Sequence, residues 1–271
     1  MGARPITFLS DYGYEDEFAG VCRAVIARIA PDAPVIDLTH GIRRHDIQRG
    51  AIVLANALPY SPAGIHLAVV DPGVGSPRRA VAVRTATEDR TLVGPDNGLL
   101  WPAIERLGGA VAAIDISLSD LRLEPISATF HGRDIFAPIA AHLARGASLA
   151  EAGEEINAES LVPMEASKPT LEADRIVAHV VSLDRFGNAA LDLVGEDLPQ
   201  TGLRMGRGVT VETAGETRDA IFTLTFADVP DGSLLLYENS YGSLALAVNR
   251  GDAAADLGLG AGSEVILRAV G

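Results

Sequence analysis

Short apolar runs alternate with segments of helical periodicity over the first half of the chain. The runs 6–10, 34–39 and 65–70 are rich in Val, Ile and Leu and are typical of buried strands. Between them, the segments 17–30 and 46–60 carry apolar residues at helical spacing. Short strands that alternate with helices predict an α/β domain with a mostly parallel sheet between helices.

The same alternation continues to about residue 146. Asp46 stands where the N-cap of the second helix is expected. Further strands are predicted at 80–85, 91–94 and 112–117, and further helices at 99–108 and 132–146.

The pattern changes near residue 160. The segment 162–174 is polar, contains two prolines and is typical of a linker. Beyond it, β-branched or alternating runs are separated by Gly, Asp and Pro turns, which predicts an all-β module. Its expected strands are 175–184, 189–194, 208–213, 221–229, 233–239 and 243–249. We therefore predict an α/β domain over 1–162 and a β-barrel-like domain over 172–271.

Charge and composition limit the partners. The net charge is −14, which argues against nucleic acid and against an anionic membrane surface, because both require a basic face. No apolar run approaches the ~20 residues of a membrane span, and no signal peptide is apparent, so a cytoplasmic location is expected. The single cysteine, Cys22, excludes a disulfide within the chain and a cysteine-cluster metal site.

Three predicted strands end in a polar residue. Asp11 follows the first strand, His40 the second and Asp71 the third. Each alone is typical of a turn or a helix cap. Because ligands bind at the carboxyl ends of parallel strands, the three together indicate a site at one edge of the sheet. The two carboxylate oxygens of Asp11 suit the two hydroxyls of a ribose.

The loop "VVDPGVGSPRR" at 69–79 follows the third strand. It lacks the GK[ST] of a P-loop and leads into a strand instead of a helix N-terminus, so a phosphate-binding role is not supported. Asp71 and Arg78 instead stand near the two ends of this loop, where its chain could fold back and bring them side by side. An arginine beside an aspartate keeps the carboxylate ionised.

A histidine and several turn residues complete the candidates. His131 and Gly132 stand directly before a predicted helix. A metal site of the His/Asp type could use His40 and His45 of one loop with Asp11, Asp16 and Asp46, but no HxH or HExxH spacing supports one, and no metal is predicted. The alternative of a metal-dependent hydrolase would use Asp11, His40, Asp46 and His131. In the all-β module the turns hold Asp184, Phe186, Asn188, Ser240, Asn249 and Arg250, each alone typical of a hairpin.

Taken together, these stretches resemble the S-adenosylmethionine hydroxide adenosyltransferases, which are related to the bacterial fluorinase and chlorinase. The resemblance rests on "SDYG", "HDIQRGA", "VVDPGVGSPRR", "GPDNGLL", "TFHGRDIF", "DRFGN" and "NSYGSLALAVN". It implies hydrolysis of S-adenosylmethionine to adenosine and methionine without a cofactor. It also implies a homotrimer, with each site between the N-terminal domain of one subunit and the C-terminal domain of the next.

The resemblance also implies residue roles. Asp71, Arg78 and His131 match the Asp–Arg–His set of the hydrolases, and Asp11 matches the ribose-binding aspartate. Where the fluorinase has a fluoride-binding serine this chain has Gly132, and Asp71 stands where the fluorinase has a tyrosine. A carboxylate at that position repels a halide and favours water.

The matched residues of the second domain are expected to hold the rest of the substrate. By the resemblance, Asp184 binds the methionine ammonium, Phe186 packs on adenine and Asn188 hydrogen-bonds adenine. Ser240 matches a serine near the methionine carboxylate. The backbone around Asn249 and Arg250 matches an adenine contact.

The implied reaction is attack of water on the ribose 5′ carbon with methionine as the leaving group. Asp71 accepts a hydrogen bond from the water, and Arg78 stays protonated and orients Asp71. His131 is suited to take or relay the proton, so the sequence leaves open which of Asp71 and His131 is the base. The alternatives are a halide-using transferase of the same fold, a metal-dependent hydrolase and a non-catalytic adenosine or S-adenosylmethionine binder.

Overall fold

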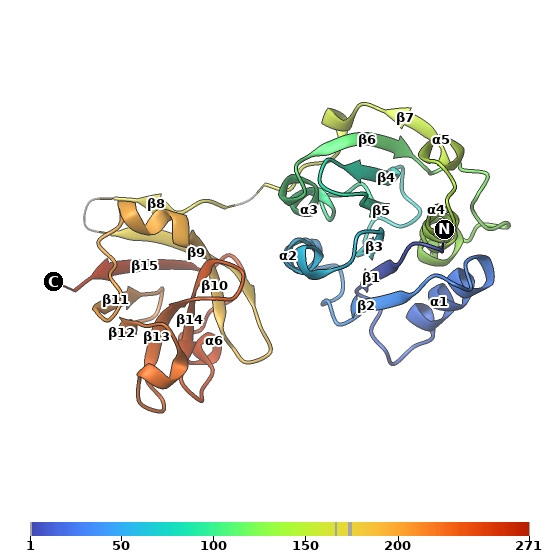
Figure 1. Cartoon of the computed structure of the whole chain (residues 1–271). Coiled ribbons are helices and arrows are strands. Elements are labelled where there is room, and N and C mark those ends of the chain that lie inside the picture. Colours follow the sequence, from blue (N-terminus) through green and yellow to red (C-terminus); the bar gives the residue numbers. More distant parts are fainter. Residues whose placement is uncertain (1, 166, 173–174, 271) are drawn as a thin grey trace. The chain divides into compact units, whose positions relative to one another are not determined.

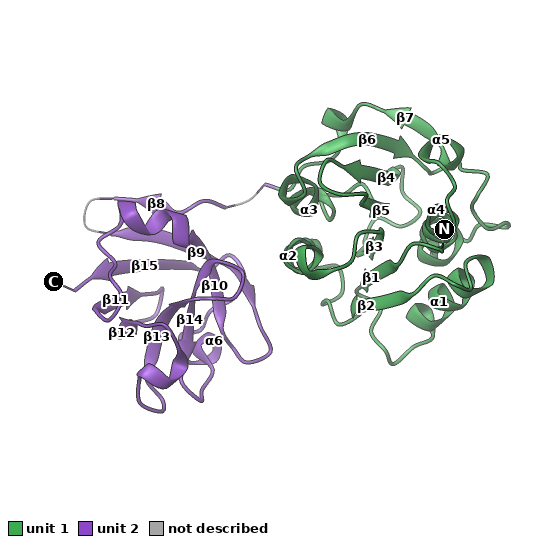
Figure 2. Cartoon of the chain, viewed as in Figure 1, with its two compact units in different colours: residues 1–164 green, residues 165–271 purple. Residues whose placement is uncertain are grey.

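The computed structural model describes residues 2–165, 167–172 and 175–270. The chain divides into two compact units, an N-terminal unit of residues 1–164 and a C-terminal unit of residues 165–271 (Figure 2). The predicted linker, 162–174, lies at this division, and its residues 166, 173 and 174 are outside the described residues.

The N-terminal unit contains one sheet, which over residues 2–164 has the strand order β2-β1-β3-β5-β4-β6-β7 (Figure 1). The strands are β1 (Ile6–Ser10), β2 (Val35–Thr39), β3 (Ile65–Val69), β4 (Ala80–Thr85), β5 (Thr91–Pro95), β6 (Ala110–Asp115) and β7 (Glu154–Ile156). The strands β1, β3 and β5 are buried along their whole length, as expected for a sheet covered on both faces.

The sheet is mixed, so the predicted predominance of parallel pairing is not found. β1 pairs in parallel with β2 and β3, and β3 with β5. β4 is antiparallel to β5 and β6, and β6 is antiparallel to β7. The reason is the short connection 86–90 between β4 and β5. A connection of this length closes a hairpin, whereas a parallel pair needs a crossover of a dozen or more residues.

Helices cover both faces of this sheet (Figure 1). They are α1 (Phe18–Ile29), α2 (Ile47–Ala57), η1 (Leu58–Tyr60), α3 (Trp101–Arg106), η2 (Gly132–Phe136), α4 (Ala137–Ala144), α5 (Leu149–Ala152) and η3 (Ala158–Ser160). α1 and α4 pack with Phe8 in one core, and α2 and α3 pack with Leu9 in another. The neighbours Phe8 and Leu9 therefore point to opposite faces. Asp46 caps α2 as predicted, since its side chain accepts a hydrogen bond from the Arg49 N–H at 2.9 Å.

The C-terminal unit is a β-barrel with short helical turns. Its described strands follow the order β10-β14-β13-β12-β11-β15-β9-β8, and the additional β9–β10 pairing closes the barrel. They are β8 (Thr170–Leu171), β9 (Ile176–Leu183), β10 (Ala189–Val194), β11 (Gly208–Glu212), β12 (Thr217–Phe222), β13 (Leu234–Glu238), β14 (Ser243–Val248) and β15 (Glu264–Ala269). Between them lie η4 (Gly195–Gln200), η5 (Phe226–Asp228) and α6 (Ala253–Asp256). The prediction of an all-β second domain agrees with this architecture.

Some predicted elements differ from the structure. The strand expected at 221–229 ends at Phe222, and residues 226–228 form a 3-10 turn. β7, β8 and β15 were not anticipated, and β8 falls in the segment predicted as a linker. β15 is essential to closure because it pairs with both β11 and β9. Among the described residues no helix has the length and hydrophobicity to cross a membrane.

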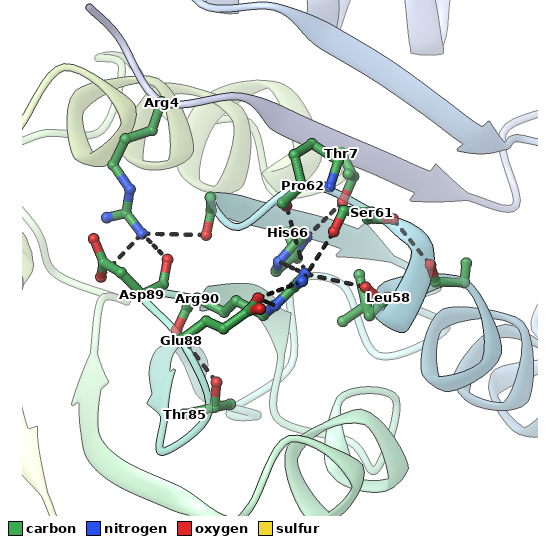
Figure 3. Close-up of polar contacts among 12 residues, drawn as sticks. Arg4, Thr7, Leu58, Ser61, Pro62, His66, Thr85, Glu88, Asp89 and Arg90 are labelled. Carbon is green, nitrogen blue, oxygen red and sulfur yellow. Dashed lines mark hydrogen bonds and ion pairs between the residues drawn. The ribbon is translucent and has the colours of Figure 1, made fainter. Parts of the chain in front are cut away.

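A buried polar network joins β1, β3 and the chain before β5 (Figure 3). The His66 imidazole is fully buried, with Nδ1 2.9 Å from Thr7 Oγ1 and Nε2 3.3 Å from Arg90 Nη1. Arg90 also donates to the carbonyl oxygens of Leu58 and Ser61. Because a guanidinium only donates, Nε2 of His66 accepts, and the proton of the neutral ring lies on Nδ1.

The His66 network predicts a pH dependence of stability. Burial, with the positive charges of Arg90 and Arg4, lowers the pKa of His66 to about 3. The unfolded chain, with a histidine pKa of about 6.5, binds a proton that the native state lacks below that pH. The free energy of unfolding should therefore fall as pH drops from about 6.5 towards 3, by about 1.4 kcal/mol per unit from this group.

The variant His66→Gln isolates this contribution. Denaturant unfolding at several pH values should show a shallower acid loss of stability for His66→Gln than for the unmodified chain. Equal slopes below pH 6.5 would show that His66 does not stay neutral in the native state.

Candidate active site

The carboxyl ends of β1, β2 and β3 lie at one edge of the N-terminal sheet, because these strands are parallel neighbours. Asp11 directly follows β1, His40 directly follows β2, and Asp71 comes two residues after β3. A cavity of about 760 Å³ opens at this edge, and all three residues line it together with His131. A site at this edge is what the strand-end argument predicts.

A bridging arginine holds the charged residues of the cavity together. Arg78 Nε donates to Asp71 Oδ1 at 2.9 Å, and Arg78 Nη2 donates to Asp71 Oδ2. The same Nη2 lies 2.9 Å from His131 Nδ1. The side chains of Arg78 and Asp71 are only 10% and 6% exposed. The predicted trio therefore meets in space, although 53 residues separate Arg78 from His131.

Gly75 lets the loop after β3 fold against the segment before η2. It has a φ of +78°, and a Cβ there would lie 2.6 Å from the Ala128 carbonyl oxygen. Glycine at this position therefore allows the close approach that joins the loop to the segment bearing His131.

Arg79, the neighbour of Arg78, takes a different partner. Its Nε donates to Asp96 Oδ2 at 2.8 Å, and its Nη1 donates to Ser160 Oγ at 2.9 Å. Asn97 donates from Nδ2 to the Val70 carbonyl oxygen at 2.9 Å and so anchors the backbone next to Asp71. Of the two adjacent arginines, only Arg78 is directed to Asp71.

His131 is held by an unusual helix start. It directly precedes η2, a single π-helical turn that continues into α4. Such turns are frequent at functional sites. The buried Asp134 in this turn accepts a hydrogen bond from the Ser127 N–H at 2.8 Å, which fixes the preceding segment. Desolvation, followed by the positive charge of Arg78, lowers the pKa of His131, so the imidazole is neutral near pH 7.

The position of the proton on neutral His131 follows from Arg78. A guanidinium has donors and no acceptor, so His131 Nδ1 must accept from Arg78 Nη2. The ring proton is then on Nε2. His131 consequently offers the cavity a hydrogen-bond donor, Nε2–H. Its one unprotonated nitrogen, Nδ1, is already occupied by the hydrogen bond from Arg78.

Asp11 is tied to the loop after β2. Its Oδ2 accepts a hydrogen bond from the His45 N–H at 3.0 Å. His45 has a φ of +67°, a left-handed conformation that is uncommon for residues other than glycine. Strained backbone of this kind clusters at functional sites. No described residue is hydrogen-bonded to Oδ1, so this oxygen is available to a ligand.

His40 has a structural role in the site. Its buried ring places Nδ1 2.7 Å from Ser10 Oγ and Nε2 3.4 Å from Asp37 Oδ1. Its carbonyl oxygen accepts from the Gly13 N–H at 2.8 Å. Burial lowers the pKa of His40, which favours the neutral ring. His40 therefore fixes the turn that carries Asp11.

The alternative metal set does not assemble. The His40 ring is directed at Ser10 and Asp37, and Asp46 is used as a helix cap. Across the described ranges, no group of three or more His, Cys, Asp or Glu side chains is arranged to hold a metal ion.

Three matched residues of the C-terminal unit lie in one turn, between β9 and β10. Asp184 Oδ1 accepts from the N–H groups of Phe186 and Asn188, and Oδ2 accepts from Asn188 Nδ2 at 2.7 Å. These bonds give Asp184 a structural role in addition to the one that the resemblance implies. The Phe186 ring is 68% exposed, so it is free to pack against a ligand.

The other matched residues flank β14. Ser240 lies in the turn before this strand, whereas Asn249 and Arg250 directly follow it. Asn249 donates to the Val229 carbonyl oxygen at 2.8 Å, and Arg250 pairs with Asp231 at 3.0 Å. Ser240 and the Asn249–Arg250 pair therefore lie at opposite ends of β14.

The cavity also contains residues that the sequence reasoning missed. Tyr12, Tyr14 and Phe18 line it beside Asp11. The Tyr12 ring centroid lies 6.0 Å from that of Phe18 and 5.9 Å from that of Phe130. The run of aromatic residues after the first strand was the available signal, because solvent-facing loops seldom carry so many.

A cavity lined by a carboxylate and an imidazole that are bridged by one guanidinium, in an α/β domain of a chain that also has a β-barrel, is a candidate enzyme active site. The models of the SAM hydroxide adenosyltransferase N-terminal and C-terminal domains match residues 6–153 and 178–266. The chain therefore belongs to the SAM hydroxide adenosyltransferase family.

Relatives cover almost the whole chain. An (R)-S-adenosyl-L-methionine hydrolase of Salinispora tropica is 46% identical over 263 residues, which is 96% of each chain. A fluorinase of Nocardia brasiliensis is 28% identical and covers 97% of each chain. The solved structure of an uncharacterised conserved protein from Thermotoga maritima has a TM-score of 0.90 at 35% identity and covers 97% of this chain and 99% of its own.

Proposed function

We propose that this protein is an enzyme that hydrolyses S-adenosyl-L-methionine to adenosine and L-methionine. Family membership and the name of the Salinispora tropica relative support this, and the same name supports the (R) form of the substrate. The observation that carries the proposal is that Asp71 and His131, which share hydrogen bonds from Arg78, both line a cavity that Asp11 also lines. The fluorinase relative is more distant, which favours water over halide.

The reaction is a displacement at the ribose 5′ carbon. A bond forms between the water oxygen and C5′ while the bond between C5′ and the sulfonium sulfur breaks, and the sulfur keeps the electron pair. Positioning of two reactants can lower such a barrier by ~7–11 kcal/mol in favourable cases. The leaving group is already cationic, so we propose that neither a metal nor a cofactor is required.

The geometry favours Asp71 as the group that takes the proton from water. Arg78 donates once to each Asp71 oxygen, and a carboxylate has about four acceptor positions, so further positions remain for water. Neutral His131 has its proton on Nε2 and its lone pair directed at Arg78. We therefore assign His131 the role of donor to the developing hydroxide.

Asp11 is proposed to bind the ribose hydroxyls through its unshared oxygen. In the C-terminal unit, Phe186 and Asn188 are proposed to bind adenine, with backbone contacts near Asn249 and Arg250. Asp184 and Ser240 are proposed to bind the amino-acid tail. The predicted cytoplasmic location stays a prediction.

Incubation with S-adenosylmethionine tests the function. Chromatography should show equal amounts of adenosine and methionine, with the same rate after EDTA treatment. Asp71→Asn should lower kcat by about 10²–10⁴-fold, the usual contribution of a general base, with adenosine affinity largely kept. Asp89→Asn is the matched control, because Asp89 is 71% exposed and pairs with Arg4 away from the cavity.

Two outcomes would contradict the proposal. Adenosine formation no faster than the uncatalysed background would exclude hydrolysis. Asp71→Asn turnover equal to that of Asp89→Asn would remove Asp71 from the chemistry.

We also propose that the enzyme is a homotrimer, with each substrate held by the N-terminal unit of one subunit and the C-terminal unit of the next. Light scattering during size-exclusion chromatography should then give three times the chain mass of 28.3 kDa. A monomer mass at assay concentration, with full activity, would refute shared sites.

A further inference from the structure

Gly132 and Tyr12 compete for one small volume in the cavity wall. A Cβ built on Gly132 would overlap the Tyr12 hydroxyl oxygen and would lie 3.0 Å from Tyr12 Cζ. The conformation of Gly132 is helical and imposes no need for glycine. Steric exclusion by the Tyr12 hydroxyl is therefore the reason that position 132 carries no side chain.

The Tyr12 hydroxyl is fixed in this place. Its ring contacts the rings of Phe18 and Phe130 edge-on or tilted, and the Tyr12 N–H donates to Ser10 Oγ at 3.2 Å. Gly132 directly follows His131, and both line the same cavity as Tyr12 and Asp71. The hydroxyl therefore lies close to the place where we put the attacking water.

The hydroxyl is neutral and unengaged. Burial, followed by the charges of Cys22, Asp11 and Asp71, raises the pKa of Tyr12 well above its ordinary value. A neutral phenol both donates and accepts. Within the described part of the chain, no group is hydrogen-bonded to this oxygen. The Tyr12 side chain is only partly buried and lines the cavity, so its hydroxyl is open to water or a ligand there.

We propose that the Tyr12 hydroxyl is a further catalytic group, which donates a hydrogen bond to the attacking water oxygen beside His131. The inference rests on the proposed hydrolysis. As the water proton moves to Asp71, the oxygen gains a third lone pair. One lone pair forms the bond to C5′, and the other two accept from His131 Nε2 and Tyr12 Oη. Tyr12 keeps its own proton, so the step balances.

Tyr12→Phe tests the chemical role. The kcat should fall about tenfold or more, as expected for the loss of one donor to developing charge, while KM stays within about twofold. Tyr60→Phe is the matched control, since Tyr60 is 75% exposed in η1 and does not line the cavity. A kcat for Tyr12→Phe equal to that of Tyr60→Phe would overturn the proposal, provided that the unmodified enzyme forms adenosine.

Thermal unfolding tests the shared volume independently of activity. Gly132→Ala should lower the melting temperature strongly when residue 12 is Tyr and much less in the Tyr12→Phe background, because the overlapping atom is gone. Equal effects in the two backgrounds would overturn the steric part of the inference. If the unmodified enzyme makes no adenosine but this coupling is present, the proposed function fails and the Tyr12–Gly132 packing stands.

Discussion

Arg78 is the residue on which the organisation of the cavity depends. One guanidinium donates twice to Asp71 and once to His131, all within a largely buried site. Burying two charges is costly, and a two-pronged arginine–carboxylate pair is among the few arrangements that offset the loss of hydration. The pair restricts both side chains to one geometry. After desolvation, the positive charge of Arg78 is the second cause that lowers the pKa of His131, because a fixed positive charge opposes protonation of the imidazole.

The fold brings the partners of Arg78 together from distant parts of the chain. β3 ends next to β1, so Asp71 and Asp11 share one edge of the sheet. The loop after β3 is then folded against the Ala128 backbone through Gly75, which brings Arg78 to His131. The π-helical turn and the buried Asp134 hold His131 from the other side. The loop after β3 therefore connects the strand-end residues to the segment that bears His131.

Strand-end reasoning and motif resemblance identified Asp11, Asp71, Arg78 and His131 because each stands at a recognisable position in the sequence. His40 met the same criterion, yet its ring is buried against Ser10 and Asp37 and supports the turn instead. A residue's position after a strand does not reveal which way its side chain points. The mixed sheet could have been predicted, since the connection 86–90 between the apolar runs of β4 and β5 is too short for a parallel crossover.

The relation between Tyr12 and Gly132 could not be predicted from sequence at all. The two residues are 120 positions apart, and only the folded chain shows that the hydroxyl of one fills the side-chain volume of the other. Glycine before a helix is ordinary in a sequence. The constraint on position 132 comes from the hydroxyl oxygen of Tyr12, which lies in the loop after β1.

The position of the proton on the His131 ring decides whether Asp71 is the base. Nitrogen-15 chemical shifts of the His131 ring at neutral pH, with assignment by a His131→Gln variant, measure this directly. We expect Nδ1 to show the shift of an unprotonated nitrogen and Nε2 that of a protonated one. A protonated Nδ1 with an unprotonated Nε2 would contradict the account, because His131 would then present a free base to the cavity.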